Sequence, residues 1–169
     1  MLRVRPEEDA DHERVRAVHE AAFGRPDEAR LVEALRASAH PAISLVAELD
    51  GRVAGHVFFS PVGLEPSSPG FAAAALGPLA VGPPAQGRGI GSALVRAGLE
   101  RCPGQGWRAV FLLGNPAYYE RFGFAPAGPL GLLYGSEALE RAFQVRELAP
   151  GALAGCRGRV RYHEAFAGL

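Results

Sequence analysis

Three closely spaced glycines follow an apolar segment in the sequence QGRGIGSA, residues 86–93, and an amphipathic segment begins directly behind them. Gly87, Gly89 and Gly91 lack the Cβ atoms that would keep a bulky anion away from the main chain, and glycine tolerates the backbone angles of a tight turn. The first turn of the helix expected there has unpaired N–H groups and partial positive charge. Arg88 adds a charge that can fork onto phosphate oxygens. The pattern predicts a phosphate-binding loop.

Two common phosphate-binding loops do not match this stretch. The glycines read GxGxG, so the third glycine of a dinucleotide-binding fingerprint is missing at its spacing. A nucleoside-triphosphate loop needs a Lys followed by Ser or Thr, and that pair is absent. The alternative is a plain turn, but a turn needs only one or two glycines, whereas here three precede a helix and stand beside Arg88.

A second motif, NPAYYERFGF at residues 115–124, follows the apolar segment AVFLLG. Pro116 suits the first turn of a short helix. The helix carries Tyr118 and Tyr119, whose phenols, with an unperturbed pKa of about 10, can donate a proton. The competing interpretation is that both rings fill the core or a cleft wall. Asn115 can cap the helix or hydrogen-bond a ligand.

The two motifs together resemble the GCN5-related N-acetyltransferase (GNAT) family. Gln86, Gly89 and Gly91 match the acetyl-coenzyme A signature QxxGxG/A behind a strand, here LGPLAV, and NPAYYERFGF is similar to the segment that opens with Asn and ends with Gly-Phe. The resemblance covers nearly all 169 residues and extends to a bacterial subgroup of small acetyltransferases, through SLVAELDGRVAGHVFFSPV and ELAPGALAG. It implies a single α/β domain over residues 1–169, with a mixed central sheet flanked by helices in the order β-α-α-β-β-β-α-β-α-β-β.

The resemblance implies an enzyme that transfers the acetyl group of acetyl-coenzyme A to a primary amine by direct attack in a ternary complex. Transfer needs an anchored thioester, a polarised carbonyl, a neutral amine and a proton for the departing thiolate. By resemblance, Tyr119 supplies that proton, Tyr118 packs, and the pantetheine arm lies in a gap between two strands. The implied cofactor-binding residues are Leu79, Ala80 and Val81 in the strand, Gln86, Gly87, Arg88, Gly89, Ile90, Gly91 and Ser92 in the loop, and Asn115.

No motif marks the general base. Glu28 lies between the first two expected helices, in a region that forms part of the acceptor wall in the resembled family, and it is our candidate. Other titratable groups lie on or near the central strands, in the first helix and in the tail, where solvated or structural roles compete with catalysis: Glu48, His56, Glu65, His19 and His163. A base that acts through ordered water would leave no signature.

Hydrophobic periodicity predicts the elements that must position these groups. We expect strands at residues 2–5, 43–49, 53–60, 71–81, 109–113, from 124, 143–148 and 159–162, and helices from within 6–11 to 23, at 27–35, 89–101 and 116–119. Asp50-Gly51 is typical of a two-residue hairpin turn. Gly77-Pro78 within a strand predicts a bulge, because Pro has no ladder donor. Residues 61–70, rich in Pro, Ser and Gly, are expected to form a loop.

Composition excludes several classes of protein. Arg supplies all 18 basic residues, and 18 acidic residues balance them, so neither nucleic acid nor a strongly basic partner is expected. A chain of this length buries about 70% of its surface in one core. Cys102 and Cys156 fit no metal-ligand spacing, and no serine stands in a GxSxG setting, so we expect no metal and no hydrolase. No apolar run approaches the about 20 residues of a membrane span, and we expect a cytoplasmic protein.

Two other functions share these motifs: an acyltransferase with another acyl group or acceptor, and a non-catalytic acetyl-coenzyme A sensor. Tyr119 favours an enzyme. The acceptor wall is expected from residues 23–28, 61–70 and 127–135, whose low charge disfavours polycations, while small amines, amino acids and protein amines stay open. The protein is expected to be a monomer or a homodimer, since an edge strand at 159–162 could pair between subunits.

Overall fold

The computed structural model describes residues 1–169, and the helices and strands occupy these ranges. In chain order they are β1 Leu2–Pro6, α1 His12–Phe23, α2 Asp27–Ser38, β2 Ile43–Leu49, β3 Arg52–Glu65, β4 Ala73–Val81, α3 Ile90–Arg101, β5 Ala109–Leu113, α4 Pro116–Tyr119, β6 Ala125–Pro126, β7 Leu132–Leu133, β8 Phe143–Glu147 and β9 Gly158–Arg161. Short 3-10 turns join several of them, and the last turn, η7, spans Glu164–Gly168. None of the helices has the length and apolarity to cross a bilayer.

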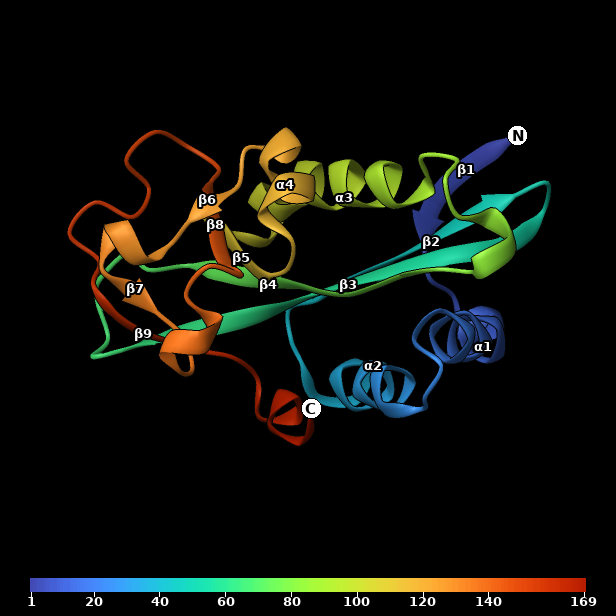
Figure 1. The fold of residues 1–169 in the computed structure, drawn as a ribbon, viewed down its shortest axis with the longest axis horizontal. Helices are drawn as coiled ribbons and strands as arrows, with labels where there is room; N and C mark the ends of the chain where they lie inside the picture. The colour runs from blue at the N-terminus through green and yellow to red at the C-terminus, as the bar shows by residue number, and fades with distance from the viewer.

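One mixed sheet runs through the molecule in the order β1-β2-β3-β4-β5-β8-β6. Its neighbours are antiparallel except β4 and β5, which the crossover helix α3 makes parallel. Helices α3 and α4 cover one face of the sheet, whereas α1, α2 and η7 cover the other (Figure 1). The predicted α/β class and element order are confirmed, with the two-residue β7 as an addition before β8.

Alternation along β3 explains why helices cover both faces. Val57 and Phe59 belong to the cluster that packs under α3, whereas Phe58 belongs to the cluster with α1 and α2. Successive side chains of a strand point to opposite faces, so a run of apolar residues is buried on both sides. Gly98 of α3 leaves room for the Phe59 ring, which a Cβ at that position would overlap.

The sheet opens between β4 and β5. Ala73 to Ala75 of β4 pair with β5, but no pairing follows, because β4 then pairs with β3 alone and the end of β5 with β8. The register on β3 shifts between Val57 and Phe59, so that two β4 residues, Gly77 and Pro78, face one β3 residue. The predicted bulge is confirmed, and it lies where the two strands part.

Two predictions about strand extent were wrong. Residues 61–70 were expected to form a loop, but β3 continues to Glu65 because β9 pairs with its last three residues. Residues 159–162 were expected at a sheet edge, but β9 lies between β3 and β7, and β7 pairs with Gly158 and Arg159. The predicted hairpin turn is confirmed, since Asp50 and Gly51 have the positive φ angles, 52° and 81°, of a type I′ turn.

Candidate functional site

The glycine loop presents a row of unpaired N–H groups. Gly87 and Gly89 have φ angles of 79° and 77°, a region that only glycine adopts readily, and Gly89 is the residue that precedes α3. The first intrahelical bond joins the Ala93 N–H to the Gly89 carbonyl at 3.0 Å, and the N–H groups of residues 87–92 have no backbone acceptor. The Gln86 side chain donates to the Val81 carbonyl at 3.0 Å and ties the loop to the end of β4.

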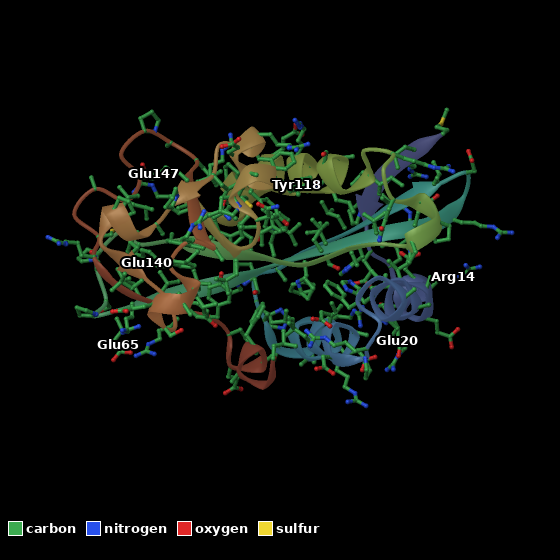
Figure 2. All side chains as sticks on the ribbon, viewed as in Figure 1. Arg14, Glu20, Glu65, Tyr118, Glu140 and Glu147 are labelled. Carbon is green, nitrogen blue, oxygen red and sulfur yellow. The ribbon has the colours of Figure 1, made fainter.

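Helix α4 is fixed next to this loop by its cap and by Tyr118. The Asn115 side chain accepts a hydrogen bond from the Ala117 N–H at 3.0 Å, which confirms the capping interpretation. Tyr118 lies where α4 faces α3, and its hydroxyl is 3.3 Å from the Ser92 hydroxyl (Figure 2). A Cβ at Gly91 would lie 3.3 Å from that same phenol oxygen, so the third glycine of the motif accommodates Tyr118.

Tyr119 faces a different environment from Tyr118. Its ring packs edge-on against Tyr118 and Phe124, with centroid distances of 4.9 and 6.0 Å. A Cβ at Gly114 would lie 2.5 Å from the Tyr119 ring, so this glycine makes room for it. Burial, with a smaller contribution from Tyr118, raises the pKa of Tyr119 to about 12. The phenol therefore keeps its proton at neutral pH, as a proton donor requires.

A cavity of about 470 Å³ lies at the parting of β4 and β5. The bulge and Leu79 line it from β4, Leu113 from the end of β5, and Tyr119 from α4. Phe23 and Glu28 line it from α1 and α2. Its volume falls within the range of about 300–1,000 Å³ that is usual for small-molecule sites. Of the predicted site residues, the cavity therefore brings together Leu79, Tyr119 and Glu28, whereas residues 86–92 lie along the loop at the end of β4.

Two of the three segments predicted to form the acceptor wall line this cavity, and their role in binding the acceptor stays a prediction. Residues 23–28 contribute Phe23 and Glu28, and residues 127–135 contribute Tyr134. Residues 61–70 do not line the cavity. Tyr162 and Phe166, which follow β9 in the chain, also line the cavity. They were not predicted, because nothing in the local sequence indicates that η7 returns to α2.

Glu28 is a buried carboxylate with one cationic neighbour. Its side chain is 8% exposed, and it accepts hydrogen bonds from Arg25 at 3.0 Å to Oε1 and 2.5 Å to Oε2. The Arg25 guanidinium lowers the pKa of Glu28 and outweighs the opposite effect of burial. An ionised carboxylate with a lowered pKa is a weak proton acceptor. The general-base role of Glu28 stays a prediction, and its electrostatic setting favours holding a cation instead.

The other acidic candidates and the tail histidine have structural partners away from the cavity. Glu48 pairs with Arg5, and Glu65 pairs with Arg161 where β3 and β9 meet, far from Tyr118 in Figure 2. The His163 ring accepts a hydrogen bond from the Ala165 N–H and begins η7.

His19 and His56 are fully buried and belong to a hydrogen-bond chain that the sequence did not reveal. His19 Nε2 is 2.9 Å from His56 Nδ1, His56 Nε2 is 2.7 Å from Ser44 Oγ, and Ser44 Oγ is 2.8 Å from Glu7, which Arg36 holds. Because a carboxylate only accepts, the Ser44 hydroxyl donates to Glu7. Ser44 Oγ therefore accepts from the His56 Nε2–H, and His56 Nδ1 in turn accepts from the His19 Nε2–H. His19 Nδ1 is then an unprotonated nitrogen with no protein partner.

No group of three or more His, Cys, Asp or Glu side chains is arranged to hold a metal ion. Both cysteines are buried and free. The site therefore consists of a sheet opened between two parallel strands, a row of free main-chain donors behind the first strand, and a tyrosine at the opening.

This combination of fold and site defines an acyltransferase, and the comparisons with known proteins agree. The sequence model of the acetyltransferase (GNAT) domain matches residues 3–127. The chain belongs to the GNAT family of acetyltransferases.

Relatives in two bacteria are similar over most of this chain. The N-acetyltransferase YhbS of Escherichia coli K12 is 39% identical over 164 residues, which cover 96% of this chain and 97% of YhbS. YjhQ of the same strain is 40% identical over 125 residues, 72% of this chain and 69% of YjhQ. The crystal structure of Escherichia coli YhbS in complex with CoA has a TM-score of 0.90 at 37% identity and covers 98% of this chain and 92% of that one. A Brucella melitensis GNAT acetyltransferase in complex with acetyl-CoA has a TM-score of 0.80 at 38% identity, with 98% of each chain covered.

Proposed function

We propose that this protein transfers the acetyl group of acetyl-CoA to a primary amine by direct attack in a ternary complex. The observation that carries the proposal is the unpartnered edge of β4 over residues 79–81, which begins at the Tyr119 cavity and ends at the glycine loop. Similarity to two structures in complex with CoA and acetyl-CoA supports the same assignment.

The residues present fit the two chemical parts of acetyl-CoA. Main-chain N–H groups of residues 87–92 and the exposed Arg88 side chain suit a pyrophosphate, because they combine directed donors with positive charge. Pantetheine carries two amides, and alternate residues of β4 direct their main-chain groups away from β3. These are Leu79 and Val81, because the bond from the Gly82 N–H to the Ala54 carbonyl places Ala80 in a pair that bonds β3. The contact of Ala80 with the cofactor stays a prediction. Asn115 is already engaged as a cap, so its contact with the cofactor stays a prediction.

The chemistry follows from groups at the opening of the sheet. The nitrogen lone pair of a neutral amine attacks the thioester carbon, the C–N bond forms, and the C–S bond breaks. A main-chain N–H of β4 polarises the carbonyl oxygen, and Tyr119 gives its proton to the departing sulfur. The attacking nitrogen releases one proton to solvent, and solvent returns a proton to the Tyr119 oxygen. The presence of this protonated phenol in the cavity favours an enzyme over an acetyl-CoA sensor. The identity of the acyl group stays open.

We also propose that residues 1–169 form one domain, since β9 near the end of the chain pairs with β3 near its middle. The predicted cytoplasmic location depends on composition alone and stays a prediction, as does the choice between monomer and homodimer.

The test is thermal unfolding with and without acetyl-CoA. A ligand that binds only the folded state, at one hundred times its dissociation constant, adds about 2.7 kcal/mol to the free energy of unfolding. We expect this gain in the wild type and its loss in an Arg88→Ala, Gly89→Asp double variant. Arg14→Ala, an exposed arginine on α1 across the sheet from the loop, is the matched control and should keep the gain (Figure 2). The proposal fails if neither CoA nor acetyl-CoA stabilises the wild type.

A further inference from the structure

Aromatic rings from distant parts of the chain form one wall of the Tyr119 cavity. Tyr134 and Tyr162 lie with ring centroids 4.3 Å apart, and Tyr162 packs edge-on against Phe166 at 5.0 Å. We call these three residues the aromatic wall. From α1, Phe23 adds a fourth ring to the lining and is 40% exposed, a large fraction for this side chain. Aromatic rings that line a cavity suit an apolar ligand body.

The charge in the cavity is a single carboxylate. Among the 14 lining residues Glu28 is the one charged side chain, and no Arg, Lys or His lines the cavity. Arg25 donates one hydrogen bond to each Glu28 oxygen, and each carboxylate oxygen can accept more than one hydrogen bond. An ammonium group therefore finds a side chain of opposite charge among the lining residues, whereas an anionic group finds none.

We propose that this cavity is the acceptor site and that it selects a small primary amine with one positive charge and an apolar, aromatic body. The inference rests on the proposed function and names its substrate class. Glu28 attracts the ammonium form, the aromatic wall holds the body, and the amine loses a proton to solvent before it attacks. The neutral amine and the acetyl thioester then become an amide and a free thiol. The nitrogen loses one hydrogen as the amide forms, and the sulfur gains one as it becomes the thiol.

The same geometry excludes three acceptor classes that the sequence left open. An amino acid would bring its carboxylate close to the Glu28 carboxylate in a cavity that no cationic side chain lines, and like charges repel. A polyamine or an aminoglycoside would bring several charges to one carboxylate. A lysine side chain of a protein would fill the cavity with a flexible alkyl stem and leave the aromatic wall without a ring partner.

The first experiment compares acceptors by free-thiol release at saturating acetyl-CoA. We expect kcat/KM for 2-phenylethylamine to exceed that for phenylalanine by about 100-fold, because the two differ by the carboxylate alone. Spermidine and a lysine-bearing peptide should be slower by about 10-fold or more. The proposal is overturned if any of these three equals 2-phenylethylamine, or if 2-phenylethylamine is not acetylated.

Two variants test the assigned contacts. Glu28→Gln should raise KM for 2-phenylethylamine by about 10-fold and leave KM for acetyl-CoA unchanged, because it removes half of an ion pair. Glu33→Gln is the matched control on the same helix, since Glu33 pairs with Arg16 outside the cavity. A fall in kcat with constant KM would instead support the general-base role and overturn the binding role.

Phe166→Ala should raise KM for 2-phenylethylamine, whereas Leu130→Ala, at an exposed position outside the cavity, should not. Equal effects of the two variants would contradict the aromatic wall.

The thermal shift with acetyl-CoA separates the two proposals. If the shift is present and a different class of amine is acetylated, the proposed function stands and the acceptor inference falls.

Discussion

Tyr118 and Tyr119 are adjacent in sequence, yet their rings are nearly perpendicular, at 88°, and their hydroxyls meet different groups. Tyr118 contacts Ser92 at the start of α3, whereas Tyr119 lines the cavity without a protein hydrogen-bond partner. Adjacent residues in a short helix point in directions about 100° apart, so only one of the two can face the opening. The geometry therefore separates the residue beside the loop from the residue beside the acceptor.

We expect Tyr119→Phe to lower kcat by about 100-fold or more, the usual contribution of a general acid, while the thermal shift with acetyl-CoA persists. Tyr118→Phe provides the contrast, because any effect should fall on the affinity for acetyl-CoA through the lost contact with Ser92. Since the pKa of Tyr119 is about 12, wild-type kcat should not decline between pH 7 and 10 through its ionisation. Equal kcat values for the two variants would remove Tyr119 from the mechanism.

At the residue scale, the sequence predicted the features that depend on residues close together in the chain. The glycine loop and the tyrosine that reaches the cavity come from short contiguous motifs. The pairing of Glu28 with Arg25 also had a local signal, the i, i+3 spacing, but the sequence did not indicate its burial. The contact between His19 and His56 joins residues 37 positions apart, and it depends on which face of β3 the His56 ring occupies.

At the scale of elements, the distance between α3 and the sheet depends on a missing side chain. We expect Gly98→Ala to destabilise the protein by about 1–3 kcal/mol, because its Cβ would overlap the fully buried Phe59 ring. This outweighs the helix propensity that alanine adds, about 1 kcal/mol. Urea denaturation measures the change. Gly63→Ala in β3, where a Cβ meets nothing within 4 Å, should stay within about 0.5 kcal/mol of the wild type. Similar losses in both variants would refute the close approach.

Element prediction succeeded where patterns are local and failed where a distant partner decides. The helices and most strands follow from apolar periodicity within each segment. The second half of β3 contains turn-forming residues and was expected to be a loop, yet Gly63 pairs with Arg161 and Glu65 with Arg159, residues that lie more than 90 positions downstream. Pairing with a strand at that separation overrides local propensity, and a single segment cannot reveal it.

At the scale of the whole molecule, the buried histidine chain makes stability depend on pH. Burial lowers the pKa of His19 from 6.5 to about 4 and lowers that of His56 as well. Both rings are neutral in the folded protein, whereas the unfolded chain takes up protons below about pH 6.5. The stabilisation is thus complete above pH 6.5 and is lost as the pH falls toward 4, by about 1.4 kcal/mol per pH unit for His19 alone.

The prediction is checked by chemical denaturation between pH 7.5 and 5. The pKa values of Asp11 and Glu28 are lowered from 3.8 and 4.5, so both carboxyl groups titrate below this pH window. The slope of the unfolding free energy against pH should be smaller in His19→Phe than in the wild type. His40→Gln, at an exposed position, should leave the slope unchanged. An unchanged slope in His19→Phe would mean that His19 is not neutral in the folded protein.

The resemblance to a family predicted the architecture as a whole, because two motifs in the right order specify their neighbours. It predicted only part of the lining of the Tyr119 cavity, which comes from α1, α2, β4, β5, α4, the segment after β7 and η7. A surface assembled from so many segments has no signature in any one of them. The chemistry of the cavity can be inferred only from the structure, which shows that Glu28 and the aromatic wall line the same cavity.

The parting of β4 from β5 also bears on how such a protein can change over evolutionary time. On the proposed function, the cofactor arm is recognised by main-chain groups of residues 79–81, and every residue except proline presents the same N–H and C=O. Substitutions along that edge can therefore accumulate without altering cofactor recognition. The acceptor, in contrast, is recognised by side chains, which a single nucleotide change can replace. Descendants of one ancestor can thus keep a common acyl donor while they diverge in the amines that they modify.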